Sequence, residues 1–172
     1  MRRLLLFMLI VCVAAFCAAG VRAQSKIAVL TVDGGIGPAT ADYVARGIAQ
    51  AEAERAAAVL IELNTPGGLD SSMREIVSSE MNSHVPVIVY VAPAGARAAS
   101  AGCIITLAAG IAAMAPGTNI GAAHPVYSNG DTVSEKITND AAAFARSLAQ
   151  AHGRNAADGQ NIDKLPHRGR VS

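Results

Sequence analysis

Apolar and polar residues along this chain are grouped in blocks that predict strands and helices in turn. Apolar runs rich in β-branched residues predict strands at 27–32, 57–63, 86–92 and 111–114. Apolar positions at helical spacing predict one helix from Pro38, another from Leu69 to Met81, and a last one after Gly130. A further helix is expected to begin at Ser100.

Polar residues near two predicted helix starts suggest side-chain caps. Asp70 or Ser72 is expected to cap the helix that reaches Met81, and Thr132 with Glu135 has the spacing of a capping box. Both pairs stand just before an apolar stripe, which is where a helix N-terminus needs acceptors for its free N–H groups.

Strands that alternate with helices predict an α/β protein with a parallel sheet covered on both faces. In such sheets, ligands bind at the carboxyl ends of the strands. The turns at Gly34, Gly67 and Gly95 follow predicted strands. We therefore expect the loop 64–68 and the segment around Ser100 to meet at one rim of the sheet.

The two ends of the chain differ from this globular pattern. Two arginines precede an apolar run from Leu4 to Ala19, followed by Val21-Arg22-Ala23, with small residues where signal peptidase reads them. The run is short for a membrane span, so residues 1–23 are predicted to be a cleaved signal peptide rather than a retained anchor. We expect one domain over 24–156 and a disordered or aberrant tail over 157–172, which is polar and aperiodic.

Charge and cysteine content exclude several classes of function. Without the three arginines of the signal peptide, 11 of the 14 basic residues remain against 13 acidic ones, a net charge of −2. This balance, with no Trp, argues against nucleic-acid binding. Cys103 would be the one cysteine left, which predicts a buried thiol, no internal disulfide, no metal and no cofactor.

Ser100 is the first candidate for chemistry, because it lies in the run Ala98-Ala99-Ser100-Ala101-Gly102. Small neighbours let a substrate backbone approach, and the free N–H groups of a helix start can hold an oxyanion. The same run also suits a closely packed helix start, so the motif alone is weak.

Two residues are candidates for a base that would activate Ser100. Lys136 stands beside an apolar stripe, where lost hydration favours a neutral amine, but it can equally be a solvated surface lysine. His124 is the residue type most often used as a base, but it can equally be a loop residue before Pro125. The residues alone leave both alternatives open.

Four segments in order resemble the NfeD family of membrane-associated serine proteases. They are LNTPGG at 63–68, VYVAP at 89–93 with GARAASAG at 95–102, MAPGTNIGA at 114–122, and KITND at 136–140. The resemblance runs from about Ile27 to Asn155 and implies a Clp-protease/crotonase-like stack of β-β-α units. The tail after 156 departs from the family pattern, so we expect it to be a truncated end.

The resemblance implies a serine endopeptidase with a Ser/Lys dyad. Ser100 matches the family's nucleophile and Lys136 its base, and the backbone N–H groups of Gly67, Gly68 and Ala101 would form the oxyanion hole. In Clp proteases the base is a histidine near the position of His124, so a Ser100/His124 pair ranks second.

The resemblance also implies partners and a location. The expected substrate is an apolar segment of a stomatin-like membrane protein, the expected assembly is a homodimer, and the expected place is the periplasmic or extracellular side of a membrane. One alternative is a truncated, inactive module that only binds such a partner. Another is an acyl-CoA enzyme of the crotonase type, which the export signal disfavours because CoA thioesters are cytoplasmic.

Overall fold

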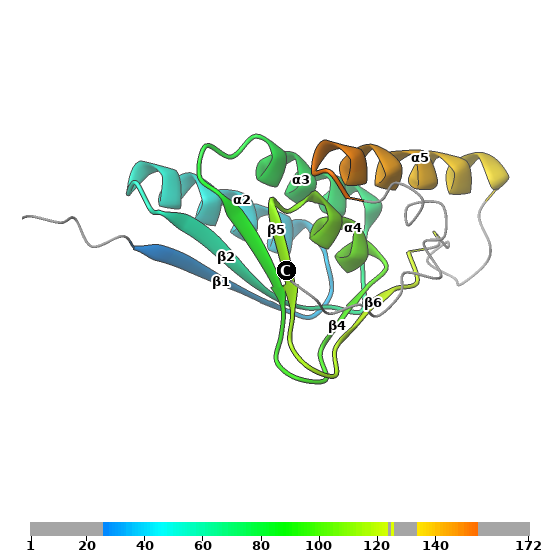
Figure 1. The fold of residues 1–172 in the computed structure, drawn as a ribbon. Coiled ribbons are helices and arrows are strands. Elements are labelled where there is room, and N and C mark those ends of the chain that lie inside the picture. Colours follow the sequence, from blue (N-terminus) through cyan, green and yellow to red (C-terminus); the bar gives the residue numbers. More distant parts are fainter. Residues whose placement is uncertain (1–25, 124, 126–133, 155–172) are drawn as a thin grey trace, which may run out of the picture.

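The chain folds into a four-stranded parallel sheet with helices packed against it (Figure 1). The computed structural model describes residues 26–123, 125 and 134–154. The strand order is β1-β2-β3-β5, and every neighbouring pair is parallel. The strands are β1 (Ile27–Asp33), β2 (Ala58–Asn64), β3 (Val87–Val91) and β5 (Ile111–Met114). The prediction of four strands is confirmed, with each boundary within one residue.

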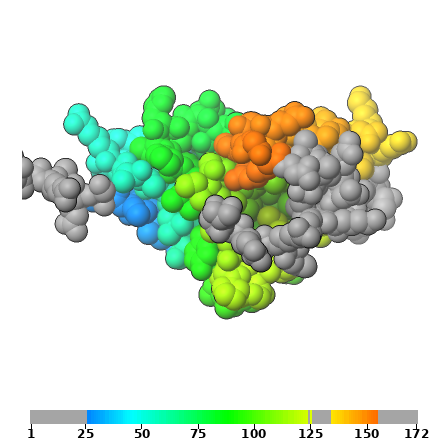
Figure 2. Space-filling view, viewed as in Figure 1, coloured from blue at the N-terminus to red at the C-terminus, as the bar shows by residue number. Residues whose placement is uncertain are grey.

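The predicted helices are also present. They are α2 (Pro38–Ala53), α3 (Asp70–Met81), α4 (Ala101–Ala108) and α5 (Glu135–Ala151). Helix α3 packs against both α2 and α4, and α5 packs against α4. Figure 2 shows α5, in yellow and orange, lying beside the green residues of the preceding helices. The buried positions of these helices and the inward side chains of the strands form one hydrophobic core.

The prediction that helices cover both faces of the sheet is wrong for the part of the chain that the structure describes. Its helices lie on one face of the main sheet (Figure 1). On the other face, Val29, Leu60, Ile88 and Ile111 stand side by side in register across the four strands. Val29 is 54% exposed and Ile111 is 51% exposed. Their apolar character suggested burial on two sides, but at these two positions it is found on an open face.

A second, smaller sheet was not predicted. It pairs β4 (Arg97–Ala99) with β6 (Asn119–Gly121) in parallel. Each strand has only three residues, which is too short for an alternating pattern to be recognised. A bridge between Thr65 and Ala98 links this sheet to the end of β2. The small sheet therefore carries the chain from the turn at Gly95 directly to Ser100.

The predicted caps are wrong at both helices. The N-cap of α3 is Leu69, with no side-chain cap, and its N–H donates to the carbonyl of Ile36. Ser72 is buried inside the helix. Helix α5 begins at Glu135 with Ser134 at the N-cap and no side-chain cap.

Several predictions concern residues outside the described part of the chain. These are the signal peptide over 1–23, the tail over 157–172, and the positions of His124 and Thr132. Within residues 26–154, as far as they are described, no helix is both long enough and apolar enough to cross a membrane.

Candidate active site

Ser100 lies at the N-cap of α4 in a strained backbone conformation. Its φ is 52° and its ψ is −115°, a region that residues with a side chain rarely adopt. Such a conformation costs about 1–3 kcal/mol and persists only where the surroundings fix it. Here the N–H of Ser100 donates to the carbonyl of Gly121 in β6 at 2.9 Å, and the N–H of Ala99 donates to the carbonyl of Thr65 at 3.1 Å.

The loop after β2 presses its backbone against Ser100. Gly67 has φ of +115°, and a Cβ built there would lie 2.6 Å from Ser100 Cβ and 3.1 Å from its Oγ. At Gly68 a Cβ would lie 2.0 Å from the carbonyl oxygen of Ile36. Both positions therefore require glycine, one because of Ser100 and one because of the neighbouring loop.

The three predicted oxyanion donors are not equivalent. The N–H of Gly67 donates to Thr65 Oγ1 at 3.0 Å, so that group is already used within the loop. Within the described residues, the N–H groups of Gly68 and Ala101 have no hydrogen-bond partner. Ala101 is the first residue of α4, where a backbone N–H has no acceptor inside the helix. Gly68 and Ala101 thus present N–H donors beside Ser100 that no described residue occupies.

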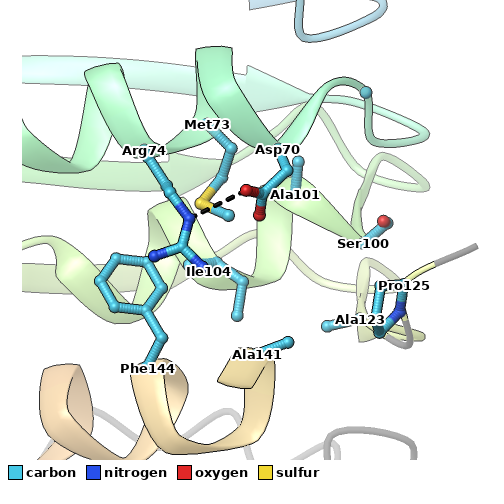
Figure 3. Close-up of a pocket in the computed structure, with 11 residues that line it drawn as sticks. Asp70, Met73, Arg74, Ser100, Ala101, Ile104, Ala123, Pro125, Ala141 and Phe144 are labelled. Atoms are coloured by element: carbon cyan, nitrogen blue, oxygen red, sulfur yellow. Dashed lines mark hydrogen bonds and ion pairs between the residues drawn. The ribbon is translucent and has the colours of Figure 1, made fainter. Parts of the chain in front are cut away.

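Ser100, Gly68 and Ala101 border a cavity of about 130 Å³ between α3, α4 and α5 (Figure 3). Its lining is partly apolar and partly polar, with Asp70 and Arg74 among the polar residues. Met73, Ile104 and Ala141 line the space between the helices, and Arg74 lies with Phe144 at the end away from Ser100. Among the described residues, the Ser100 hydroxyl and these two N–H groups have no hydrogen-bond partner, and a hydroxyl, two donors and a cavity are the parts that an acyl-transfer site requires.

The structure does not bring Lys136 to Ser100. Lys136 lies in the first turn of α5 with its side chain exposed, and it is not part of the cavity lining. Ser100 and Lys136 are both described, and no hydrogen bond joins Ser100 Oγ to Lys136 Nζ. Ala141, further along the same helix, does line the cavity. The role of Lys136 as a base stays a prediction.

His124, the alternative base, is outside the described residues. Its two neighbours are described, and both Ala123 and Pro125 line the cavity. The chain on either side of His124 therefore reaches the same cavity as Ser100. The predicted pairing of Ser100 with His124 is not tested by the described residues.

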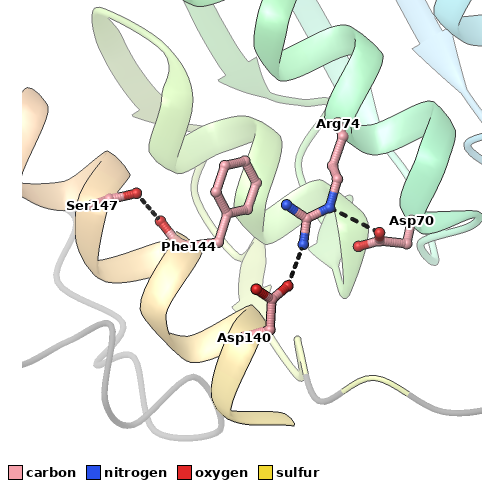
Figure 4. A network of polar contacts seen from close by, with 5 residues as sticks. All are labelled: Asp70, Arg74, Asp140, Phe144 and Ser147. Atoms are coloured by element: carbon pink, nitrogen blue, oxygen red, sulfur yellow. Dashed lines mark hydrogen bonds and ion pairs between the residues drawn. The ribbon is translucent and has the colours of Figure 1, made fainter. Parts of the chain in front are cut away.

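A network centred on Arg74 was missed by the sequence analysis (Figure 4). Arg74 Nε donates to Asp70 at 2.9 Å within α3, and a terminal nitrogen donates to Asp140 of α5 at 2.7 Å. Its guanidinium carbon lies 4.5 Å from the centroid of the Phe144 ring. The pKa of Arg74 is raised, first by the hydrogen bond with Asp70. The four-residue spacing of Asp70 and Arg74 could have predicted their ion pair. Nothing in the sequence pointed to the contact between Arg74 and α5.

A buried carboxylate on α3 was also missed. Glu80 is buried, and within the described part of the chain neither of its oxygens has a hydrogen-bond partner. Burial raises the pKa of Glu80 well above its ordinary value, and the charge of Arg154 opposes that rise. Arg154 itself donates to the carbonyls of Leu107 and Ala109 at the end of α4. Burial lowers the pKa of Arg154, and Glu80 raises it.

The prediction that Cys103 is a buried thiol is confirmed. It is a free, fully buried thiol in α4. Burial raises its pKa to about 12, so at neutral pH it stays protonated and unreactive. Within the described residues, no group of His, Cys, Asp and Glu side chains is arranged to hold a metal ion.

The fold and this site define a class of α/β protein with a Clp-like core. ClpP1 from Listeria monocytogenes is 21% identical over 80% of both chains, with a TM-score of 0.63, and shows this fold. A sequence model described as the NfeD1b N-terminal domain matches residues 26–162, past the expected domain boundary at 156. The chain belongs to the NfeD1b N-terminal domain family.

One curated relative is the membrane-bound protease PH1510 of Pyrococcus horikoshii. It is 45% identical over 161 residues, which cover 91% of this chain and 36% of the relative. The chain thus spans about a third of that relative's length. Solved structures of the 1510-N membrane-bound stomatin-specific protease are also similar, with 42% identity over 83% of this chain. A serine-to-alanine mutant has a TM-score of 0.78 over 71% of its own chain. A lysine-to-alanine mutant in complex with a substrate peptide has a TM-score of 0.79 over 67%.

Proposed function

We propose that this chain is a serine endopeptidase in which Ser100 is the nucleophile and Lys136 the general base. The observation that carries the proposal is the strained backbone of Ser100 beside two free N–H donors. The similarity to a protease studied as serine and lysine mutants, one of them with a substrate peptide, supports the same chemistry.

The proposed reaction proceeds through an acyl-enzyme. Neutral Lys136 accepts the proton of Ser100 Oγ, which attacks the carbonyl carbon of the peptide bond. The N–H groups of Gly68 and Ala101 hold the oxyanion of the tetrahedral intermediate. Lys136 then gives the proton to the leaving amine, and water hydrolyses the ester by the same steps. Gly67 contributes as a third donor only if its N–H leaves Thr65.

The exposed position of Lys136 sets a requirement on this mechanism. The first turn of α5 must approach Ser100 when substrate or a second copy of the chain binds, because an amine acts as a base only in the neutral form that burial favours. We include in the proposal a homodimer and a location on the exported side of a membrane, after cleavage at Ala23. The proposed substrate is an apolar segment of a stomatin-like protein, by analogy with the stomatin-specific relative.

The exposure of Lys136 also favours a second candidate, an inactive module that binds the same partner without cutting it. The two candidates differ in one property, which is the reactivity of Ser100. A binding module needs the cavity but no activated hydroxyl.

A fluorophosphonate probe tests the proposal on the folded chain. We expect labelling of the wild-type protein, none in Ser100→Ala, and a loss of roughly a hundredfold or more in Lys136→Ala, as expected for removal of a general base. His124→Ala should keep its labelling. An unlabelled but folded wild type that still captures a stomatin-like partner would establish the binding module. Labelling lost in His124→Ala and kept in Lys136→Ala would make His124 the base.

A further inference from the structure

We infer that Phe144, held in place by Arg74, limits the size of the substrate side chain that enters the cavity beside Ser100. The inference rests on the proposed function, because it treats the cavity as the specificity pocket of a peptidase. Ser100 lies at one end of this cavity and Phe144 at the other (Figure 3). The ring is therefore where a side chain entering from Ser100 would stop.

The dimensions of the cavity indicate which side chains fit. Its volume is about 130 Å³, and its lining combines apolar side chains with the polar groups of Asp70 and Arg74. An apolar cavity of about 150 Å³ holds a single benzene ring. A branched aliphatic side chain therefore fits, whereas a bicyclic indole does not. Ala101, Ala123 and Ala141 are already small, and Phe144 is the bulkiest apolar residue of the lining, so its truncation would enlarge the pocket.

Arg74 holds the Phe144 ring in place and so fixes the limit on the size of the substrate side chain. The guanidinium lies over Phe144 at 4.5 Å and is itself anchored by carboxylates on two helices, Asp70 on α3 and Asp140 on α5 (Figure 4). A cation stacked on an aromatic face is attracted to it, and a guanidinium held at two points has little freedom to swing away. Asp140 precedes Phe144 by one helical turn, so the same arginine holds both residues of α5.

The test is a series of peptides that differ only at the residue before the cleaved bond, which is Ala, Val, Leu, Phe or Trp. We expect the wild type to prefer Val and Leu and to reject Trp. In Phe144→Ala the ratio of kcat/KM for Trp to that for Leu should rise about tenfold or more, since a single methylene in an apolar pocket is already worth about 10–200-fold. Arg74→Met should raise the ratio less, and so should Arg74→Lys, because an ammonium cannot make the two directed hydrogen bonds of the guanidinium.

The matched control pair compares Asp140→Asn with Asp42→Asn. Both substitutions remove a carboxylate that pairs with an arginine, but Asp42 pairs with Arg46 on α2, at 2.8 Å and away from the cavity. The selectivity ratio should move only in Asp140→Asn. A general loss of stability lowers kcat/KM for all five peptides together, so it cannot imitate a change in the ratio.

A binding measurement separates this inference from the proposed function. In Ser100→Ala, the affinities for the same five peptides should follow the same order, and Phe144→Ala added to it should improve binding of the Trp peptide. This readout needs no catalysis, so it stands even if the wild type cuts nothing. Equal effects of Phe144→Ala on the Leu and Trp peptides, in cleavage and in binding, would overturn the inference. Phe144→Leu, with milder truncation, covers the case in which Phe144→Ala does not fold.

Discussion

Ser100 has a φ of 52°, its own N–H and that of Ala99 are held by hydrogen bonds, and the absence of a side chain at Gly67 leaves room for it. The sequence could predict that Ser100 and the Gly67-Gly68 loop share one rim, since both follow strands of a parallel sheet. It could not predict that the N–H of Gly67 is taken by Thr65, because that contact depends on loop geometry.

Gly67→Ala should abolish the reactivity of Ser100. The added methyl would lie 2.6 Å from Ser100 Cβ, and alanine at a φ of +115° is strained as well. We expect roughly a hundredfold or greater loss of probe labelling, comparable to the loss of an oxyanion donor, with a lower melting temperature. Gly35→Ala is the matched control, since a Cβ there has no neighbour closer than 4.0 Å. Equal labelling of both variants would refute the close approach of Gly67 to Ser100.

The raised pKa of Glu80 predicts that the stability of the protein depends on pH. Its pKa in the folded state is raised, so above its ordinary pKa of about 4.3 the folded protein retains a proton that the unfolded chain has released. The free energy of unfolding should therefore fall as pH rises through that window, by about 1.4 kcal/mol per pH unit. Glu80→Gln should match the wild type near pH 4 and exceed it at pH 8 in urea unfolding. A constant difference between the two proteins at both pH values would contradict this.

Two arginines tie helix α5 to the rest of the molecule, one through Asp140 and one just beyond its last turn. Arg74 reaches it from α3, and Arg154, just beyond its last turn, donates to two carbonyls at the end of α4. The apolar stripe of α5 could be predicted, because a spacing of three and four residues is visible in the sequence. The arginine contacts could not, since Arg74 and Asp140 are 66 residues apart and no periodic pattern connects them.

Arg154→Met should loosen the C-terminal end of α5. The substitution removes two hydrogen bonds from a cation and leaves Glu80 without a facing positive charge, so we expect a loss of about 1–3 kcal/mol in the free energy of unfolding. Arg46→Met, which removes an exposed ion pair on α2, should cost less than about 1 kcal/mol. Combining Arg154→Met with Glu80→Gln should recover part of the loss. Equal losses in the two arginine variants would show that Arg154 is no anchor.

At the scale of the whole molecule, the order of strands and helices predicted the parallel sheet but not the side on which the helices lie. A strand buried on two faces and a strand with one open apolar face have the same composition. Val29 and Ile88 read as core positions in the sequence, yet they belong to the row of side chains that crosses the open face. The small sheet was not predicted for a different reason. A strand of three residues is too short to show an alternating pattern.

That small sheet makes the geometry of Ser100 depend on residues that are synthesised after it. The N–H of Ser100 is held by Gly121, and β4 is held by β6, so the serine adopts its conformation only after the segment up to residue 121 has folded. A nascent chain on the ribosome, or one threaded unfolded through a translocation channel, has the serine but not its surroundings. The proposed activity is thus a property of the folded chain and is absent while the segment up to residue 121 is unfolded.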